Sequence, residues 1–259
     1  MRATDYSQAV KKELAFKAVI EIGAEGIGAK RVQEWLTFHQ FGVSIDAKFG
    51  TATAAAVTKF QLAKGLQGTG IVDQDTWNAL TDPVRQVLKD GAGQGFRARI
   101  TSLLMQHLRV HPLELGGDNC GPWVRIYNDG DDGTEQRWCA GFVSFILRQA
   151  AAELARNGPV AGDTGCDEMV AQAKQAGLFV TEKQLLGGQM AWSDLGPLYL
   201  FFCRKSPGDW THVGFGFGGS ADVFDSIEGN GNHSAGENSY EVCSRTRSGV
   251  DKDYMIIPD

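Results

Sequence analysis

The stretch Thr211-His212-Val213-Gly214-Phe215-Gly216-Phe217 alternates large apolar residues with small or polar ones, and this pattern indicates the fold class of the C-terminal half. Because side chains alternate between the faces of a β-strand, the valine and both phenylalanines share one face, and the histidine shares the other with the glycines. With glycines beside it, the histidine is expected to face open space. Further apolar runs of strand length lie at Leu198–Cys203, Asp222–Ile227 and Tyr254–Ile257.

Helical patterns precede these strands. A helix is expected from Trp138 to about Asn157, where Gly158-Pro159 stops it, and another over Asp167–Ala176. Helices followed by short strands and Gly-rich turns indicate an α+β domain with an antiparallel sheet.

The N-terminal part has only helical patterns. Residues 1–25 are expected to form a lead-in helix, and residues 26–82 are expected to form a small three-helix bundle with Trp35 in its core. Residues 83–112 are expected to be a linker that contains one helix. Residues 113–259 are then the C-terminal α+β domain.

Composition argues against several classes of protein. A net charge of −6 disfavours a nucleic-acid partner, because binding phosphates needs a basic surface. No run approaches the ~20 apolar residues of a membrane helix, and Glu13, Lys17 and Glu21 interrupt any signal peptide. We therefore expect no membrane partner and a protein that is cytoplasmic as synthesised. The five cysteines include no Cys-x-x-Cys pair, so neither a disulfide framework nor a cysteine zinc site is expected.

Cys139 is the candidate nucleophile. It stands at the start of the helix that begins near Trp138, where unpaired backbone N–H groups and the positive end of the helix dipole favour a thiolate. The alternative is a small core residue, as free cysteine often is. His212 favours the first interpretation because it is a general base on a strand.

Glu228 and Asn230 follow the strand after His212. Two residues apart, they share a face, and a carboxylate at Nδ1 of His212 would stabilise the imidazolium. Asn230 is the alternative orienting group, or a residue that braces the loop.

An acidic, turn-rich loop precedes the nucleophile. Calcium is a candidate ligand because hard cations are bound by several oxygens on flexible loops, and the loop offers Asp129, Asp131, Asp132 and Glu135. Its spacing misses the full EF-hand pattern, so a solvated loop is the preferred interpretation and no metal is expected.

A set of residues runs through the expected three-helix bundle: Val32, Gln33, Trp35, Leu36, Asp46, Phe49, Gly50, Thr53, Ala56, Val57, Phe60, Gln61, Gly65, Leu66, Gly70, Asp73 and Leu80. This set resembles the three-helix peptidoglycan-binding domain of cell-wall hydrolases. That family more often has Gly where Ala47 stands. The resemblance implies peptidoglycan as a partner.

The C-terminal motifs occur in a fixed order. Trp138–Val143 opens a helix, His212-Val213-Gly214 lies 73 residues after Cys139, and Glu228-Gly229-Asn230 begins 16 residues after His212. Together they resemble the CHAP family of cysteine, histidine-dependent amidohydrolases/peptidases over residues 113–259. Agreeing stretches are Glu114–Pro122, Cys166–Glu168 and Val242–Arg247, whereas Gly196–Tyr199 stands where the family often has a Gly-Asp turn.

This second resemblance implies a papain-like α+β fold and a cofactor-free hydrolase. Cys139 would attack an amide carbonyl, His212 would protonate the leaving amine, and Glu228 would orient His212. The Cys139 N–H is an oxyanion donor, and Gln136 is a second candidate donor. The bond is an N-acetylmuramoyl-L-alanine amide or a peptide bond.

Other functions remain open at this level. A catalytically silent wall-binding protein would keep the fold, and a cysteine protease or acyltransferase would use the same residues on another substrate. A wall hydrolase without a signal peptide fits a phage-type lysin, or a secreted antibacterial effector that has a cognate immunity protein as a further partner. The site of action is then the wall, in the periplasm or outside the cell.

Overall fold

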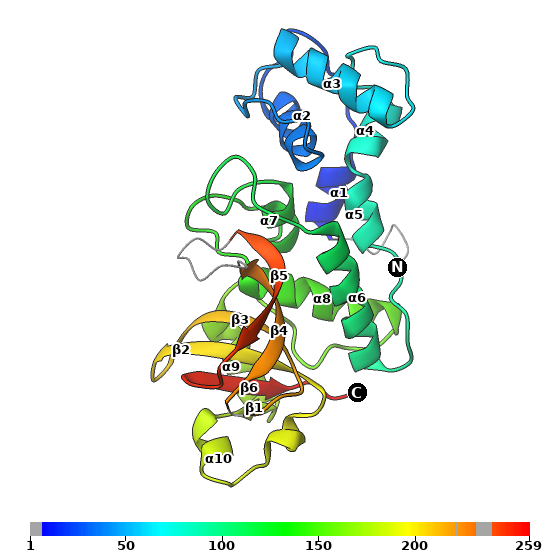
Figure 1. Cartoon of the computed structure of the whole chain (residues 1–259). Helices are drawn as coiled ribbons and strands as arrows, with labels where there is room; N and C mark the ends of the chain where they lie inside the picture. The colour runs from blue at the N-terminus through cyan, green and yellow to red at the C-terminus, as the bar shows by residue number, and fades with distance from the viewer. Residues whose placement is uncertain (1–6, 221, 232–239) are drawn as a thin grey trace. The chain divides into compact units, whose positions relative to one another are not determined.

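The computed structural model describes residues 7–220, 222–231 and 240–259, which fold into two compact units (Figure 1). The first, called the helical unit here, contains residues 7–88 and Leu113–Gln136. The second, called the sheet unit, contains Lys89–Pro112 and Arg137–Asp259. The chain therefore passes between the units after Leu88, Pro112 and Gln136.

The helical unit consists of short helices, and three of them form the expected bundle. Its elements are α1 (Gln8–Leu14), α2 (Ile27–Phe38), α3 (Thr51–Ala63), α4 (Gln74–Leu80), α5 (Asp82–Val87) and α7 (Pro122–Tyr127). Helices α2, α3 and α4 confirm the helical interpretation of this region, and Trp35 is fully buried among them.

The lead-in helix is shorter than expected. Of residues 1–25, the first six lie outside the described residues, and α1 ends at Leu14. The chain then becomes extended, and Ile20 forms an antiparallel bridge with Val72. The four-residue apolar steps were therefore misleading after Leu14: a short strand pairing takes over the backbone hydrogen bonds.

Residues 113–136 belong to the helical unit, although they were expected to open the C-terminal domain. Trp123 of α7 packs edge-on against Trp35 of α2, with ring centroids 5.8 Å apart. The Arg125 guanidinium donates to Glu13 at 2.7 Å and, through its other nitrogens, to Glu34 at 2.6 Å and Asp132 at 2.7 Å. Neither Glu13 nor Glu34 is exposed to more than 1%, so a buried ion cluster holds this segment.

The sheet unit combines an antiparallel sheet with helices, which confirms the α+β class. Its helical elements are α6 (Phe96–Val110), α8 (Cys139–Glu153), α9 (Cys166–Gln175), α10 (Glu182–Leu186) and the 3-10 helix η2 (Trp192–Leu195). Its strands are β1 (Phe179–Val180), β2 (Leu198–Ser206), β3 (Asp209–Phe217), β4 (Phe224–Gly231), β5 (Glu241–Arg247) and β6 (Lys252–Ile256).

The sheet has the strand order β1-β6-β2-β3-β4-β5. Strand β3 lies at its centre, with Cys203 of β2 opposite His212. On the other side Phe215 pairs with Ile227 of β4. Strand β5 was not expected as a strand, and it places Cys243 opposite Glu228. The central strands thus bring β3 and the end of β4 together.

Helix α8 is the central helix of the sheet unit and packs against α6, β3 and β4 (Figure 1). Phe142 is fully buried, and its ring lies 6.5 Å from that of Phe215. The start of α8 approaches β4 closely at Gly229, where an added Cβ would lie 2.5 Å from the Phe142 Cβ. Only glycine permits this contact, which fixes the helix start beside the end of β4.

Candidate functional site

Cys139 is the first residue of α8, as the sequence predicted, and it is 3% exposed. Its side chain is hydrogen-bonded to His212 and accepts from the backbone N–H of Val213. The backbone N–H of the preceding Trp138 donates to Oδ1 of Asn230 at 3.4 Å. Asn230 therefore contacts the helix start, and its two expected roles, orienting His212 or bracing the loop, stay predictions.

His212 connects Cys139 to Glu228. Its Nε2 lies 2.8 Å from Oε2 of Glu228, which leaves Nδ1 for the thiol of Cys139. The expected contact between the carboxylate and Nδ1 is therefore wrong, because β4 approaches the far edge of the ring. The structure brings Cys139, His212 and Glu228 into one hydrogen-bonded series.

Arg247 and Ser226 complete the series, and neither was predicted as a site residue. The Arg247 Nε donates to Oε1 of Glu228 at 2.7 Å, and its Nη2 donates to Oε2, so the contact is bidentate. The Ser226 hydroxyl also donates to Oε1. Because Arg247 reaches Glu228 from β5, this contact depends on a strand pairing that local sequence pattern does not reveal.

Alternating charges define the electrostatics of the site. Burial alone would raise the pKa of Glu228, but hydrogen bonds and charge from Arg247 and His212 hold it well below its usual value. Burial alone would lower the pKa of His212, yet the Cys139 thiolate and Glu228 raise it to about 10. Hydrogen bonds from Cys166, His212 and Val213 hold the pKa of Cys139 well below 9.0, against the effect of burial. The favoured state is thiolate, imidazolium, carboxylate and guanidinium in sequence.

Gly214 makes room for neighbouring side chains, whereas it was expected to leave open space beside His212. A Cβ on Gly214 would lie 2.8 Å from Cγ of Glu228 and 2.8 Å from the Phe201 ring, so the space beside His212 is filled. The expectation of open space on this face is wrong. The glycine instead lets the carboxylate lie against the central strand, next to the ring that it binds.

Cys166 lies at the start of α9, and its Sγ is 3.8 Å from Sγ of Cys139. Its hydrogen bond to the Cys139 thiolate is the largest influence that raises the pKa of Cys166, and burial and the charge of that thiolate raise it further. Cys166 is thus a thiol that donates to the Cys139 thiolate.

The loop before Cys139 belongs to the helical unit, together with Gln136. The Gln136 backbone N–H donates to Gly133 O at 2.7 Å, and its carbonyl accepts from Asn128. Its oxyanion role stays a prediction. Asp132 is occupied by Arg125 and by the Gly121 N–H. Within the described ranges no group of three or more His, Cys, Asp and Glu side chains is placed to hold a metal ion.

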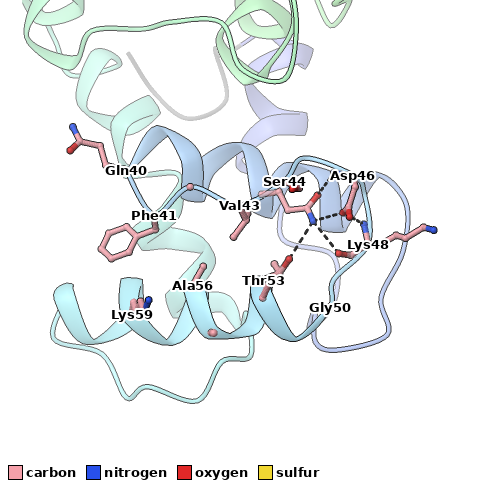
Figure 2. Close-up of a pocket in the computed structure, with 14 residues that line it drawn as sticks. Gln40, Phe41, Val43, Ser44, Asp46, Lys48, Gly50, Thr53, Ala56 and Lys59 are labelled. Carbon is pink, nitrogen blue, oxygen red and sulfur yellow. Dashed lines mark hydrogen bonds between the residues drawn. The ribbon is translucent and has the colours of Figure 1, made fainter.

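A pocket of about 640 Å³ lies in the helical unit, between the loop Gln40–Lys48 and α3. In Figure 2, Phe41, Ala56 and Lys59 lie toward one end of this pocket, and Asp46, Lys48 and Thr53 lie toward the other. Its lining combines the Phe41 ring and aliphatic groups with the Lys59 ammonium group and the Asp46 carboxylate, which suits a ligand that has both apolar and polar groups.

Two glutamines hold the loops of this bundle. The Gln33 amide donates to Asp46 at 2.8 Å and to Lys48 O at 3.0 Å (Figure 2). The Gln33 side-chain oxygen accepts from the Ala47 N–H at 2.9 Å. The Gln61 amide does the same for the next loop, donating to Ile71 O at 2.8 Å. Ala47 has a φ of 61°, the left-handed region that favours glycine. Gln33 therefore holds the Asp46 and Lys48 side of the pocket, whereas Gln61 holds a loop outside it.

The sequence comparisons agree with this geometry in the N-terminal part. Residues 26–80 match the family described as "Putative peptidoglycan binding domain". The match confirms the N-terminal resemblance and indicates association with the cell wall. No curated protein and no solved structure matched the chain. Across the described residues, no helix has the length and apolar character that crossing a membrane requires.

Proposed function

We propose that this protein is a peptidoglycan hydrolase that cleaves an amide bond by cysteine nucleophilic catalysis. The observation that carries the proposal is the series from Cys139 at a helix start through His212 to Glu228, with Nε2 of His212 2.8 Å from Glu228. A hydrogen-bonded nucleophile, base and orienting carboxylate are the parts that acyl transfer requires.

In the proposed mechanism the Cys139 thiolate attacks the amide carbonyl carbon. The developing oxyanion accepts hydrogen bonds from backbone N–H groups at the start of α8, which have no partner within the helix. His212, protonated in the resting pair, gives its proton from Nδ1 to the departing amine. The product of this step is a thioester on Cys139 and a free amine.

Hydrolysis of the thioester then returns the enzyme to its starting state. His212 is neutral after the first step, and it takes a proton from the attacking water at the same Nδ1. The tetrahedral intermediate expels the Cys139 thiolate, and the carboxylic acid leaves. Glu228 favours the protonated imidazole in both steps because its negative carboxylate stays hydrogen-bonded to Nε2 of His212.

The substrate assignment comes from the helical unit. A peptidoglycan-binding family covers residues 26–80, and the pocket beside α3 presents Phe41 together with Lys59. An ammonium group suits a carboxylate of a stem peptide, and a ring suits the apolar face of a sugar. Holding an insoluble wall raises the effective concentration of its amide bonds at the catalytic unit.

Digestion of purified sacculi tests the proposal. The full chain is expected to clear a sacculus suspension, and Cys139→Ala is expected to abolish clearing while the protein still sediments with the sacculi. The matched control is Cys120→Ala, a half-buried cysteine of the helical unit, which should clear at the unmodified rate. Clearing by Cys139→Ala would overturn the mechanism.

The binding half is tested separately in the Cys139→Ala background. Lys59→Ala is expected to reduce the fraction that sediments with sacculi, whereas Lys89→Ala, an exposed lysine of the sheet unit, leaves it unchanged. Equal sedimentation of both variants would show that the pocket does not bind the wall.

A further inference from the structure

Cys139 has a second sulfur beside it that the proposed hydrolysis does not use as a nucleophile. The Sγ atoms of Cys139 and Cys166 are 3.8 Å apart, and each cysteine is the first residue of a buried-face helix, α8 and α9. A disulfide needs the sulfurs at ~2.05 Å with χ rotations at both side chains. The remaining gap is under two ångströms, so a small adjustment at the two helix starts closes it.

The protonation states of the two sulfurs are opposite. The Cys139 thiolate is stabilised by Cys166, His212 and Val213, whereas Cys166 is held as a thiol by the charge beside it. Hydroperoxides oxidise thiolates and react slowly with thiols. Oxidation is therefore directed to Cys139, although Cys166 has the larger exposure of the two.

Oxidation of Cys139 also prepares Cys166 to react. Once Cys139 is a sulfenic acid it carries no charge, so the hydrogen bond and repulsion that keep Cys166 protonated are lost. The Cys166 thiol then ionises more readily, at contact distance from an electrophilic sulfur. The same contact that favours the nucleophile in the reduced protein supplies its resolving partner after oxidation.

We propose that Cys139 and Cys166 form an oxidative modification site: a hydroperoxide converts the contacting pair of sulfurs into a reversible intramolecular disulfide. The loss of hydrolase activity on disulfide formation rests on the function proposed above. The formation of the disulfide is independent of that function.

The chemistry balances in two steps. The Cys139 thiolate attacks the distal peroxide oxygen, the O–O bond breaks, and the departing alkoxide or hydroxide takes a proton from solvent. Sulfur loses two electrons and the hydroperoxide is reduced to alcohol or water. Cys166 sulfur then attacks Cys139 sulfur, the S–O bond breaks, and hydroxide leaves as water with the Cys166 proton. A dithiol reductant reverses the result by thiol–disulfide exchange.

Peptide mapping of the full chain tests the proposal. The protein is treated with one equivalent of hydrogen peroxide, alkylated without reduction, digested and measured by mass spectrometry. The expected product is a peptide pair linked through Cys139 and Cys166 that dithiothreitol separates. In Cys203→Ser, which removes another half-buried thiol of the sheet unit, the same linkage is expected. Absence of the linked pair in the unmodified chain, with Cys139 oxidised but not linked to Cys166, would overturn the proposal.

Recovery of activity provides the second readout. Sacculus clearing by the oxidised chain is expected to return to nearly its starting rate on adding dithiothreitol, because a disulfide is reversible by a dithiol. Cys166→Ser, and Cys166→Ala as a second variant, are oxidised beside the unmodified chain with several equivalents of hydrogen peroxide. They should stay inactive, because a second peroxide takes their unlinked Cys139 from sulfenic to sulfinic acid, which dithiothreitol does not reduce. Equal recovery in the Cys166 variants would refute Cys166 as the resolving thiol. If the reduced chain clears no sacculi, the linked peptide still decides the modification, and only the proposed function fails.

Discussion

Arg247→Met should move the acidic limit of activity to higher pH. Arg247 makes a bidentate contact with Glu228, a carboxylate with no exposed surface, and it holds the pKa of that carboxylate down. Removing one partner of a buried ion pair costs about 3–5 kcal/mol. If proton uptake by Glu228 relieves that cost, its pKa rises by about 2–4 units, since one unit corresponds to ~1.4 kcal/mol.

The direction on each side of the pH profile follows from which group is charged. Glu228 has a depressed pKa, so its ionised form is lost as pH falls; a higher pKa in the variant brings that loss to higher pH. His212 then loses the anion at Nε2, and Cys139 loses the stable imidazolium beside it. On the alkaline side Glu228 is ionised in both proteins, so the limb set by His212, with its pKa of about 10, should not move down.

The assay is the pH dependence of kcat/KM on soluble muropeptides, with thermal unfolding measured for each protein. Arg245→Met, which removes a guanidinium two residues earlier on β5, is the matched control and should keep the parent profile. An acidic limb that stays in place in folded Arg247→Met would refute the role given to Arg247.

Three other predictions concern the site and the helical unit. Glu228→Gln should move the alkaline limb down and lower turnover by about 10⁴-fold, as a permanently neutral partner does in a related triad, whereas Asn230→Ala should lose less because Asn230 contacts the backbone N–H of Trp138 at the helix start; a larger loss in the asparagine variant would reverse these assignments. Arg125→Met should lower the free energy of unfolding by about 3–5 kcal/mol in urea titrations, because it removes the closest cation from two buried carboxylates and leaves Glu13 and Glu34 with only the longer contacts to Arg31 and Lys30; an unchanged midpoint would contradict the buried cluster. The rate constant for alkylation of Cys139 by iodoacetamide should stay nearly constant between pH ~9 and ~7, because the pKa of Cys139 is lowered and the pKa of His212 is raised. A fall in this rate constant of about tenfold per pH unit, as for an ordinary thiol of pKa ~8.5, would show that no ion pair forms.

Local pattern was enough to predict the central elements. Alternation predicted β3, and the apolar stripe after Cys139 predicted α8, because both signals are periodic and internal to the element. The helical spacing of apolar residues predicted the bundle of residues 26–82. The motif residues predicted the family that matches residues 26–80, and each motif glutamine binds a loop that follows soon after it in the chain.

Long-range pairing was beyond the reach of the sequence. Arg247 meets Glu228 only because β5 pairs with β4, and Cys166 meets Cys139 only because α9 and α8 begin side by side. The segment Leu113–Gln136 joins the helical unit through the ion cluster around Arg125. In this cluster Arg125 binds Glu13, which lies 112 residues earlier in the chain. The spacing of residues along the chain does not predict such long-range contacts.

The most direct test of amide hydrolysis counts the chemical groups released from sacculi. If Cys139 catalyses amide cleavage through His212, new primary amines should appear in proportion to the material made soluble, and reducing sugar ends should stay at their starting level. With Cys139→Ala, neither new primary amines nor soluble material should appear. Release of reducing ends without amines would contradict the account, because it would show cleavage of the glycan in place of an amide.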